Sequence, residues 1–237
     1  MAAVVLAGGR GSRIQHDVNK VYLPIRDRDM LEYSLETMNR SALVDRIVLV
    51  VRDEDRASAE NLLAEMAPSK PTDVVVGGAT RHKSEEHALE ALADQIESGE
   101  VGLVAIHDGA RPFLTLDLLE TIILEARATG GAIPGLKLEE SLYRIREGAA
   151  HPLPHDTLRK VQTPQAFWAD DLLAAYRRAA EAGFEGVDTA ETVERFSDLT
   201  VTVIAGDPRN IKVTFVEDFF QAEEYALSWD KGVWTDS

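Results

Sequence analysis

The sequence predicts an α/β protein built on a Rossmann-like, mostly parallel sheet with helices on both faces. Three observations support this prediction. Short apolar runs rich in β-branched residues recur along the chain, segments with helical spacing lie between most of them, and glycine-rich or charged loops follow three of the runs. Continuous apolar strands that alternate with helices are typical of a parallel sheet covered on both faces.

Strands and helices are expected in alternation along most of the chain. The apolar runs predict strands at residues 3–6, 46–51, 73–77, 101–108 and 199–206. Helices are expected where apolar residues recur every three or four positions, because this spacing places them on one helical face. Such segments lie at residues 31–39, 54–66, 84–97, 115–129 and 170–182.

Three loops are expected at the edge of the sheet where its parallel strands end. They are residues 7–20 after the first strand, 77–84 after the third and 107–112 after the fourth. Ligands of open α/β sheets bind outside the carboxyl ends of the strands. We therefore predict that this edge carries the functional site.

Residues 136–161 break the alternation with short pieces such as SLYRIR, a Gly-Ala-Ala turn and two prolines. We interpret them as a β-arm that projects from a single domain of residues 1–237. Two exposed strands are rarely stable without something that covers them. The arm therefore predicts a homodimer.

Composition limits the classes of partner. The 237 residues carry a formal net charge of -16, no cysteine and no apolar run that approaches the ~18 residues needed to cross a bilayer. A negative field opposes non-specific binding of nucleic acid and anionic membranes, so neither is expected as a partner. Without a leader pattern at Met1 or thiols for disulfides, we expect a cytoplasmic protein. Small anionic ligands stay possible, because charges more than about 8 Å away are screened.

The first loop, LAGGRGSR, is predicted to hold phosphate. It fits neither the G-x-G-x-x-G fingerprint, because Ile14 stands where the third glycine belongs, nor the Walker pattern. Its glycines allow successive backbone N–H groups to form an anion nest, and Arg10, Arg13 and Lys20 add cations. Several cations together suit a triphosphate, while the alternative is a tight turn with solvated arginines.

The motif HDGARP at residues 107–112 follows the predicted strand 101–108. Asp108 is the candidate ligand for Mg²⁺, which takes one or two carboxylates and otherwise waters and phosphate oxygens. Arg111 is the neighbour expected to orient it. The alternative is that Asp108 only caps a helix or forms a turn.

Three further stretches carry candidate residues. In GGATRHKS at residues 77–84, Arg81 and Ser84 either approach a nucleobase or lead into a helix that Ser84 caps. In NIKVT at 210–214, Lys212 lies in an apolar strand-like run, where a lysine is expected only if it reaches an anion. VDTAE at 187–191 has the spacing of a helix capping box.

Together and in this order, LAGGRGSR, Lys20, GGATR, HDGARP, QTPQAF and NIKVT resemble the cytidylyltransferases that join CTP to a polyol phosphate. This family includes enzymes acting on 2-C-methyl-D-erythritol 4-phosphate, our leading expectation, and enzymes acting on ribitol 5-phosphate or other alditol phosphates. The resemblance extends from Ala2 to about Leu227 and implies a nucleotidyltransferase-type fold, a CDP-polyol and pyrophosphate as products, Mg²⁺ as cofactor and a dimer.

The resemblance also implies roles for individual residues. It implies a catalytic role for Arg13, Lys20 and Lys212 and metal binding by Asp108. It implies acceptor binding by Arg111, Ser141, His155 and Val187. CTP binding falls to Leu6, Ala7, Gly8, Gly9, Arg10, Gly11, Gly77, Gly78, Arg81, Ser84 and Ala110.

The chain departs from the family mainly on the acceptor side. His155 stands where the methylerythritol enzymes usually carry an arginine, Val187 replaces a threonine and Ser141 replaces another. Histidine lacks the bidentate fork of arginine and is charged only part of the time near pH 7. Either Arg144, Arg146 or Arg159 substitutes for that arginine, or the acceptor differs. Near Lys20, Asn19 and Val21 replace the family's proline and glutamine.

Overall fold

The computed structural model describes residues 1–9 and 19–229, and a single mixed sheet forms its centre. Within these residues the strand order is β10 (Arg159–Val161), β7 (Gly131–Lys137), β11 (Gln165–Trp168), β6 (Leu103–Asp108), β1 (Ala2–Leu6), β4 (Arg46–Val51) and β5 (Thr72–Val76), with β12 (Thr202–Ala205) also paired to β7. Only β10 and β11 run antiparallel to the other strands of this sheet. The predicted mostly parallel sheet is confirmed.

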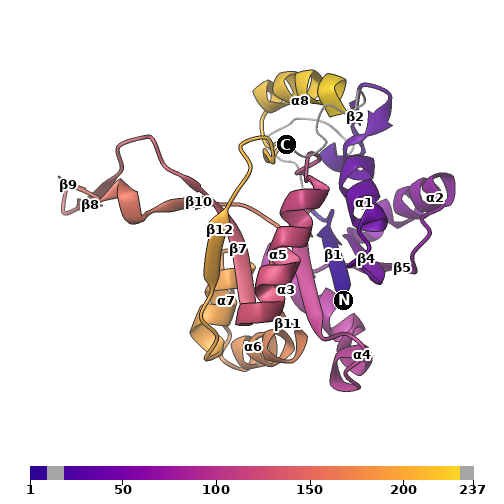
Figure 1. Cartoon of the computed structure of the whole chain (residues 1–237), viewed down its shortest axis with the longest axis horizontal. Helices are drawn as coiled ribbons and strands as arrows, with labels where there is room; N and C mark the ends of the chain where they lie inside the picture. The colour runs from indigo at the N-terminus through magenta and orange to yellow at the C-terminus, as the bar shows by residue number, and fades with distance from the viewer. Residues whose placement is uncertain (10–18, 230–237) are drawn as a thin grey trace.

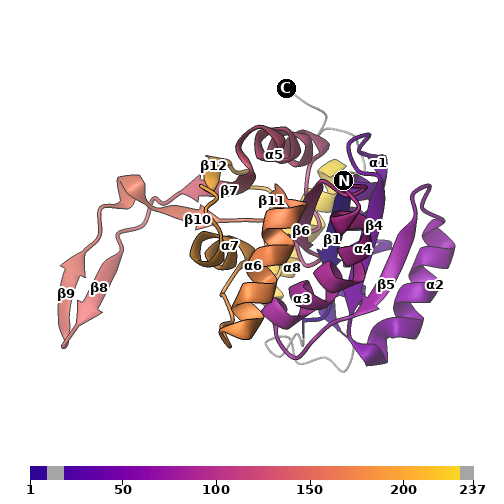
Figure 2. The same cartoon turned by 90° about the horizontal axis from the view of Figure 1, so that it is seen from below.

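Helices cover both faces of the sheet (Figures 1 and 2). One face packs against α1 (Met30–Arg40), α2 (Arg56–Met66), α5 (Leu116–Thr129) and α8 (Val216–Trp229). The other face packs against α3 (Arg81–Ala91), α4 (Ala93–Glu97), α6 (Ala169–Glu181) and α7 (Thr189–Phe196). Alternate residues of β1 and β4 belong to the two cores, as expected for strands buried on both sides. None of the helices described is long and apolar enough to cross a membrane.

The predicted strands and helices are present with small shifts of their ends, but some boundaries were wrong. The helix expected at 84–97 begins earlier, at Arg81, and is divided at Leu92 into α3 and α4. The run NIKVT was expected to be strand-like and is instead an irregular segment between β12 and α8.

The strand β7 was not predicted, because GAIPGLK contains two glycines and a proline, which are depleted in strands. Its glycines are needed for close packing. A Cβ at Gly131 would lie 2.6 Å from the ring of Phe167 on β11. Long-range packing of this kind has no signature in the local sequence.

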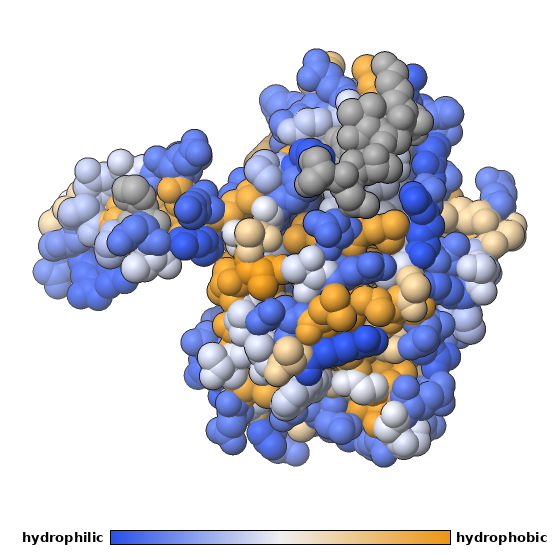
Figure 3. Space-filling model, viewed as in Figure 1, coloured by the Kyte–Doolittle hydropathy of each residue, from blue (hydrophilic) through white to orange (hydrophobic). Residues whose placement is uncertain are grey.

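The segment 136–161 does form a projecting arm, although both of its ends belong to the main sheet through β7 and β10 (Figures 1 and 2). The arm itself is the antiparallel hairpin β8 (Tyr143–Arg146) and β9 (Ala149–Pro152). Every residue of these two strands is exposed, and the space-filling view shows the arm standing apart from the body (Figure 3). Short elements complete the fold: the hairpin β2 (Pro24–Ile25) and β3 (Arg28–Asp29), and the 3-10 helices Lys20–Tyr22, Asp53–Asp55 and His155–Thr157.

The N-terminus of α5 gives a test of local stability. The Thr115 hydroxyl accepts a hydrogen bond from the backbone N–H of Leu118 and is nearly buried. We expect Thr115→Ala to lower the free energy of unfolding by about 1 kcal/mol in urea denaturation. Thr115→Ser is the control, because it keeps the oxygen and should stay close to the wild type. Equal stability of the alanine and serine variants would contradict the capping role.

Candidate active site

Two adjacent cavities lie at the predicted edge of the sheet. The larger has a volume of about 270 Å³ and is lined by Leu6, Gly8, Gly9, Lys20, Val21, Gly78, Ala79, Thr80, Arg81, Ser84, Asp108, Ala110 and Lys212. The smaller has a volume of about 160 Å³ and is lined by Arg81, Asp108, Arg111, Val161, Gln162, Thr163, Gln165, Val187, Asp188 and Lys212. Both cavities share Arg81, Asp108 and Lys212, so these three charged side chains form the boundary between them.

Most of the residues singled out in the sequence therefore meet at one place. Arg10, Gly11 and Arg13 lie outside the described residues. Ala7 and Gly77 lie next to residues that line the larger cavity. Ser141 and His155 belong to the arm segment, and Ser141 lines neither cavity.

Asp108 ends the buried strand β6 and is surrounded by cations. Its carboxylate accepts hydrogen bonds from Lys212 Nζ at 2.9 Å, Arg81 Nε at 3.3 Å and Arg111 Nε at 3.4 Å. Burial alone would raise the pKa of Asp108, but the three cations outweigh it and hold that pKa well below its usual value. Asp108 is therefore an ionised carboxylate in the folded protein, and it is more than a turn former.

A chain of hydrogen bonds fixes the backbone at Asp108. The Asp108 N–H donates to the Thr163 hydroxyl at 3.0 Å, and that hydroxyl lies 3.1 Å from Nδ1 of His107. The other ring nitrogen of His107 is 3.1 Å from the carbonyl oxygen of Arg111 and must be the donor there. Burial lowers the pKa of His107 to about 4, so the ring is neutral and accepts from Thr163. His107 thus orients Asp108 and Arg111 through the backbone.

Lys212 contacts Asp108 from a segment that is held in place by residues of the QTPQAF motif, which begins at Gln162. The Asn210 side chain is fully buried, and its Nδ2 donates to the backbone carbonyl of Thr163 at 2.8 Å. The backbone carbonyl of Asn210 accepts from Arg111 Nη1 at 2.9 Å and from Gln162 Nε2 at 3.1 Å. The expectation that Lys212 contacts an anion is confirmed, although its side chain is 42% exposed.

Lys20 starts a 3-10 helix after the phosphate loop and projects to the larger cavity, where Nζ donates to the carbonyl of Val213 at 2.6 Å. The residue before it holds the two ends of the loop together. Asn19 is buried, and its Nδ2 donates to the carbonyl of Ala7 at 2.7 Å and to Asp55 at 2.8 Å. Asp55 in turn accepts a bidentate contact from Arg52.

The glycines of the GGATR stretch pack closely against the start of α3. A Cβ at Gly77 would lie 2.6 Å from the Ser84 hydroxyl, and one at Gly78 would collide with Lys83. The alternative that Ser84 caps the helix is wrong, because Thr80 is the N-cap and accepts from the Lys83 N–H. Ser84 instead lies one turn into α3 and faces the larger cavity.

The VDTAE stretch starts α7 and borders the smaller cavity. The Asp188 side chain accepts from the Glu191 N–H at 3.0 Å, and Glu191 reaches back to the Val187 N–H at 2.7 Å, so the predicted capping arrangement is present with Val187 as the backbone donor. The Gln165 amide donates to Asp188 at 3.1 Å and fixes it from β11. Val187 is 84% exposed and borders the smaller cavity.

The sequence reasoning missed the residues that hold these groups. Their shared feature is a buried polar side chain bonded across long sequence distances, and they are Asn19, Glu85, Gln162, Thr163, Gln165 and Asn210. A buried polar residue leaves no periodic signal. The motif QTPQAF drew attention only through the resemblance.

Comparisons with known proteins agree with this geometry. The family model described as 2-C-methyl-D-erythritol 4-phosphate cytidylyltransferase matches residues 1–228. Curated proteins of that name from Geobacillus kaustophilus and Solibacter usitatus are 36% and 33% identical to this chain, covering 95% and 96% of it and 96% and 98% of their own lengths. A solved structure of 4-diphosphocytidyl-2C-methyl-D-erythritol synthase from Anaerococcus prevotii is 29% identical, with a TM-score of 0.83 and 95% of each chain covered.

The Thr163 hydroxyl gives a test of how the site is built. We expect Thr163→Val to lower the free energy of unfolding by about 1–3 kcal/mol in chemical denaturation, because the Asp108 N–H and His107 Nδ1 lose their shared partner. Thr163→Ser is the matched control and should recover most of the loss. A valine variant as stable as the serine variant would contradict the hydrogen-bond chain.

Proposed function

The chain belongs to the 2-C-methyl-D-erythritol 4-phosphate cytidylyltransferase family, and on that premise we propose that it transfers the cytidylyl group of CTP to 2-C-methyl-D-erythritol 4-phosphate, a step of isoprenoid precursor synthesis. The observation that carries the assignment within the molecule is the pair of cavities sharing Arg81, Asp108 and Lys212. Two anionic substrates that react phosphate to phosphate need adjoining sites with cations at the junction.

The larger cavity is the proposed CTP site. The phosphate loop contributes Gly8 and Gly9 to its lining, and the opposite side carries the start of α3 with Gly78 and Ser84. Backbone N–H groups at a helix start and in a glycine loop favour negative charge. Arg10, Gly11 and Arg13 are part of this proposal through the family motif alone.

The smaller cavity is the proposed acceptor site. Arg111 is oriented there by Asp108 and by the carbonyl of Asn210, and it is mostly buried. With Arg81 and Lys212 it gives the cavity three cations near the boundary with the larger one. Ser141 and His155 belong to the arm, so their proposed contact with acceptor requires the arm of a second copy of this chain.

The reaction needs alignment and charge neutralisation more than proton transfer. A phosphate oxygen of the acceptor attacks the α-phosphorus of CTP in line, a new P–O bond forms, and the bond to the bridging oxygen of the β-phosphate breaks to release pyrophosphate. The attacking oxygen is anionic at neutral pH, so no general base is required. Lys20, Arg13 and Lys212 are proposed to stabilise the negative charge that builds up around the α-phosphorus.

Asp108 is the proposed ligand for Mg²⁺. Among the described residues no cluster of three or more metal-ligating side chains exists, and Asp108 is the ionised carboxylate that both cavities share. A single carboxylate suits a Mg²⁺ ion that otherwise keeps waters and phosphate oxygens. When bound, the ion supplies further neutralisation of phosphate charge.

The function is tested by measuring pyrophosphate release from the purified chain. We expect turnover with CTP and 2-C-methyl-D-erythritol 4-phosphate, and much less with UTP, GTP or ATP. We expect Lys212→Gln to lower kcat/KM by about 10²-fold, because a charge beside the reacting phosphorus is lost.

Ribitol 5-phosphate is the comparison acceptor for the same assay. Preferred turnover of that acceptor would reassign the substrate while leaving cytidylyl transfer intact. Absence of pyrophosphate release with every polyol phosphate offered would contradict the proposal as a whole.

The arm is proposed to dimerise the chain and to complete the acceptor site. Its hairpin carries Tyr143 and Ile145, which are 57% and 64% exposed, and apolar residues of this size favour a covering partner. We expect replacement of residues 140–157 by a short Gly-Ser linker to shift the chain to monomer in sedimentation and to raise KM for the acceptor in parallel.

Leu124→Ser is the control for the arm, since Leu124 is similarly exposed but lies on α5. This variant should keep the oligomeric state of the wild type. A fully active monomer without residues 140–157 would rule out the role proposed for the arm.

A further inference from the structure

A buried carboxylate on α3 stands behind the boundary of the two cavities. Glu85 is fully buried, and the face of α3 that carries it contacts α6 and α7. Its oxygens accept hydrogen bonds from the Thr189 hydroxyl of α7 and the Tyr176 hydroxyl of α6, both at 2.6 Å. None of Glu85, Tyr176 and Thr189 lines either of the two cavities, so Glu85 lies behind their walls.

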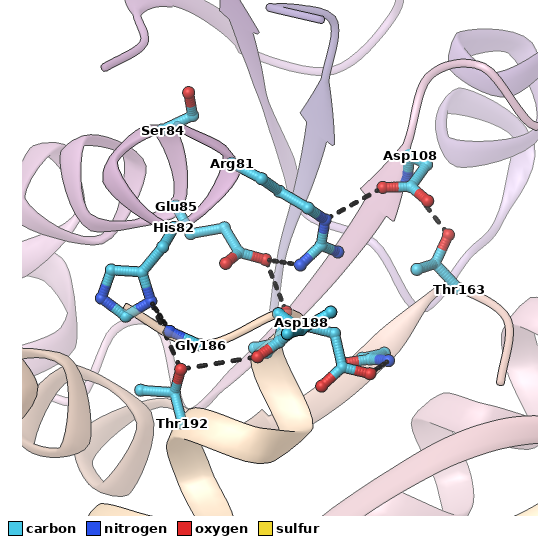
Figure 4. A network of polar contacts seen from close by, with 12 residues as sticks. Arg81, His82, Ser84, Glu85, Asp108, Thr163, Gly186, Asp188 and Thr192 are labelled. Carbon is cyan, nitrogen blue, oxygen red and sulfur yellow. Dashed lines mark hydrogen bonds and ion pairs between the residues drawn. The ribbon is translucent and has the colours of Figure 1, made fainter. Parts of the chain in front are cut away.

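Arg81 contacts two carboxylates, and its contact with Glu85 is the shorter of the two. The Arg81 Nη1 lies 2.7 Å from Glu85 Oε1, whereas Nε lies 3.3 Å from Asp108. Glu85 therefore engages one end of the guanidinium, and Asp108 holds it through a single nitrogen. Figure 4 shows the Arg81 side chain extended between these two carboxylates.

Packing alone does not explain a carboxylate at this position. Taking a carboxylate out of water costs several kcal/mol before its partners are counted, and apolar residues of similar volume often replace buried ion pairs without loss of stability. Apolar residues such as Leu89 and Val193 belong to this core, beside further buried polar residues such as His82 and Thr192. What an apolar residue could not do is restrain Arg81.

Arg81 needs such a restraint for geometric reasons. A free arginine side chain loses rotamer entropy when it contacts a phosphate. Arg81 borders both cavities and is only 25% exposed. Without Glu85, both ends of its guanidinium could turn to Asp108, because a bidentate contact is the favoured geometry of that pair.

We propose that Glu85 is a positioning residue for the transfer reaction: its buried carboxylate holds the guanidinium of Arg81 at the boundary of the two cavities, oriented toward the phosphates of both substrates. This inference rests on the proposed function. Glu85 itself contacts neither substrate and acts through Arg81.

The test compares Glu85→Gln with a matched control. Glutamine keeps the size of the side chain and an acceptor for the hydroxyls, but it removes the charge opposite Arg81. We expect Glu85→Gln to weaken CTP binding in calorimetry and to lower kcat/KM between about tenfold and a hundredfold, since small misplacements of positioning groups have effects of this size. Tyr176→Phe removes one hydrogen bond to Glu85 and leaves its charge, so it should lower Tm while kcat/KM stays within about threefold of wild type.

A double-mutant cycle separates positioning from general damage. In an Arg81→Gln background, Glu85→Gln should cause little further loss, because the residue through which it acts is already gone. An undiminished effect in that background would overturn the proposal, as would wild-type CTP affinity and kcat/KM in the single Glu85→Gln variant.

Glu85→Asp covers the case in which the glutamine variant does not fold. Aspartate keeps the charge and withdraws it from Arg81 by one methylene, so CTP affinity and kcat/KM should both fall. Wild-type values for this variant would contradict the proposal. A wild-type chain that binds CTP without turnover would refute the proposed function alone, because CTP affinity still reports the effect of Glu85 on Arg81.

Discussion

The ionised carboxylate of Asp108 at the end of β6 is the interaction on which the site depends. A buried carboxylate must be compensated, and three cations from three separate segments supply the compensation: Arg81 at the start of α3, Arg111 in the following turn and Lys212 after β12. Because an unpaired buried carboxylate would destabilise the fold, the pairing with Asp108 favours contact between loops that are distant in sequence. The boundary between the two cavities is a consequence of that pairing.

Local charge explains how an acidic protein can hold anionic substrates. The chain carries a formal net charge of -16, yet the described residues that line the two cavities include four cations, Lys20, Arg81, Arg111 and Lys212, and two carboxylates, Asp108 and Asp188. Because salt screens charges that lie more than about 8 Å away, the phosphates of a substrate interact mainly with the nearby cations.

Periodicity and position made the sheet edge and much of the site predictable. Strands such as 46–51 are continuous apolar runs because they are buried on both faces. The loops that follow parallel strands meet at one edge of the sheet. The side chains that orient the site were beyond such reasoning. Thr163, Gln165 and Asn210 act through hydrogen bonds across 20 to 60 residues, and the packing of β7 depends on the space that Gly131 leaves for Phe167. Neither these hydrogen bonds nor the packing of β7 follows from a local sequence pattern.

Asn19 shows how a departure from a family motif can preserve geometry by other means. The related enzymes have proline before the lysine, and proline fixes φ near -65°. Asn19 has φ -61°, so the backbone enters the Lys20 turn with the angle that a proline ring would impose. In place of the ring, two hydrogen bonds to Ala7 and Asp55 hold the residue, and they also join the two ends of the phosphate loop. The constraint on Lys20 has thus moved from a covalent ring to a buried amide, whose strength depends on Asp55 and its partner Arg52.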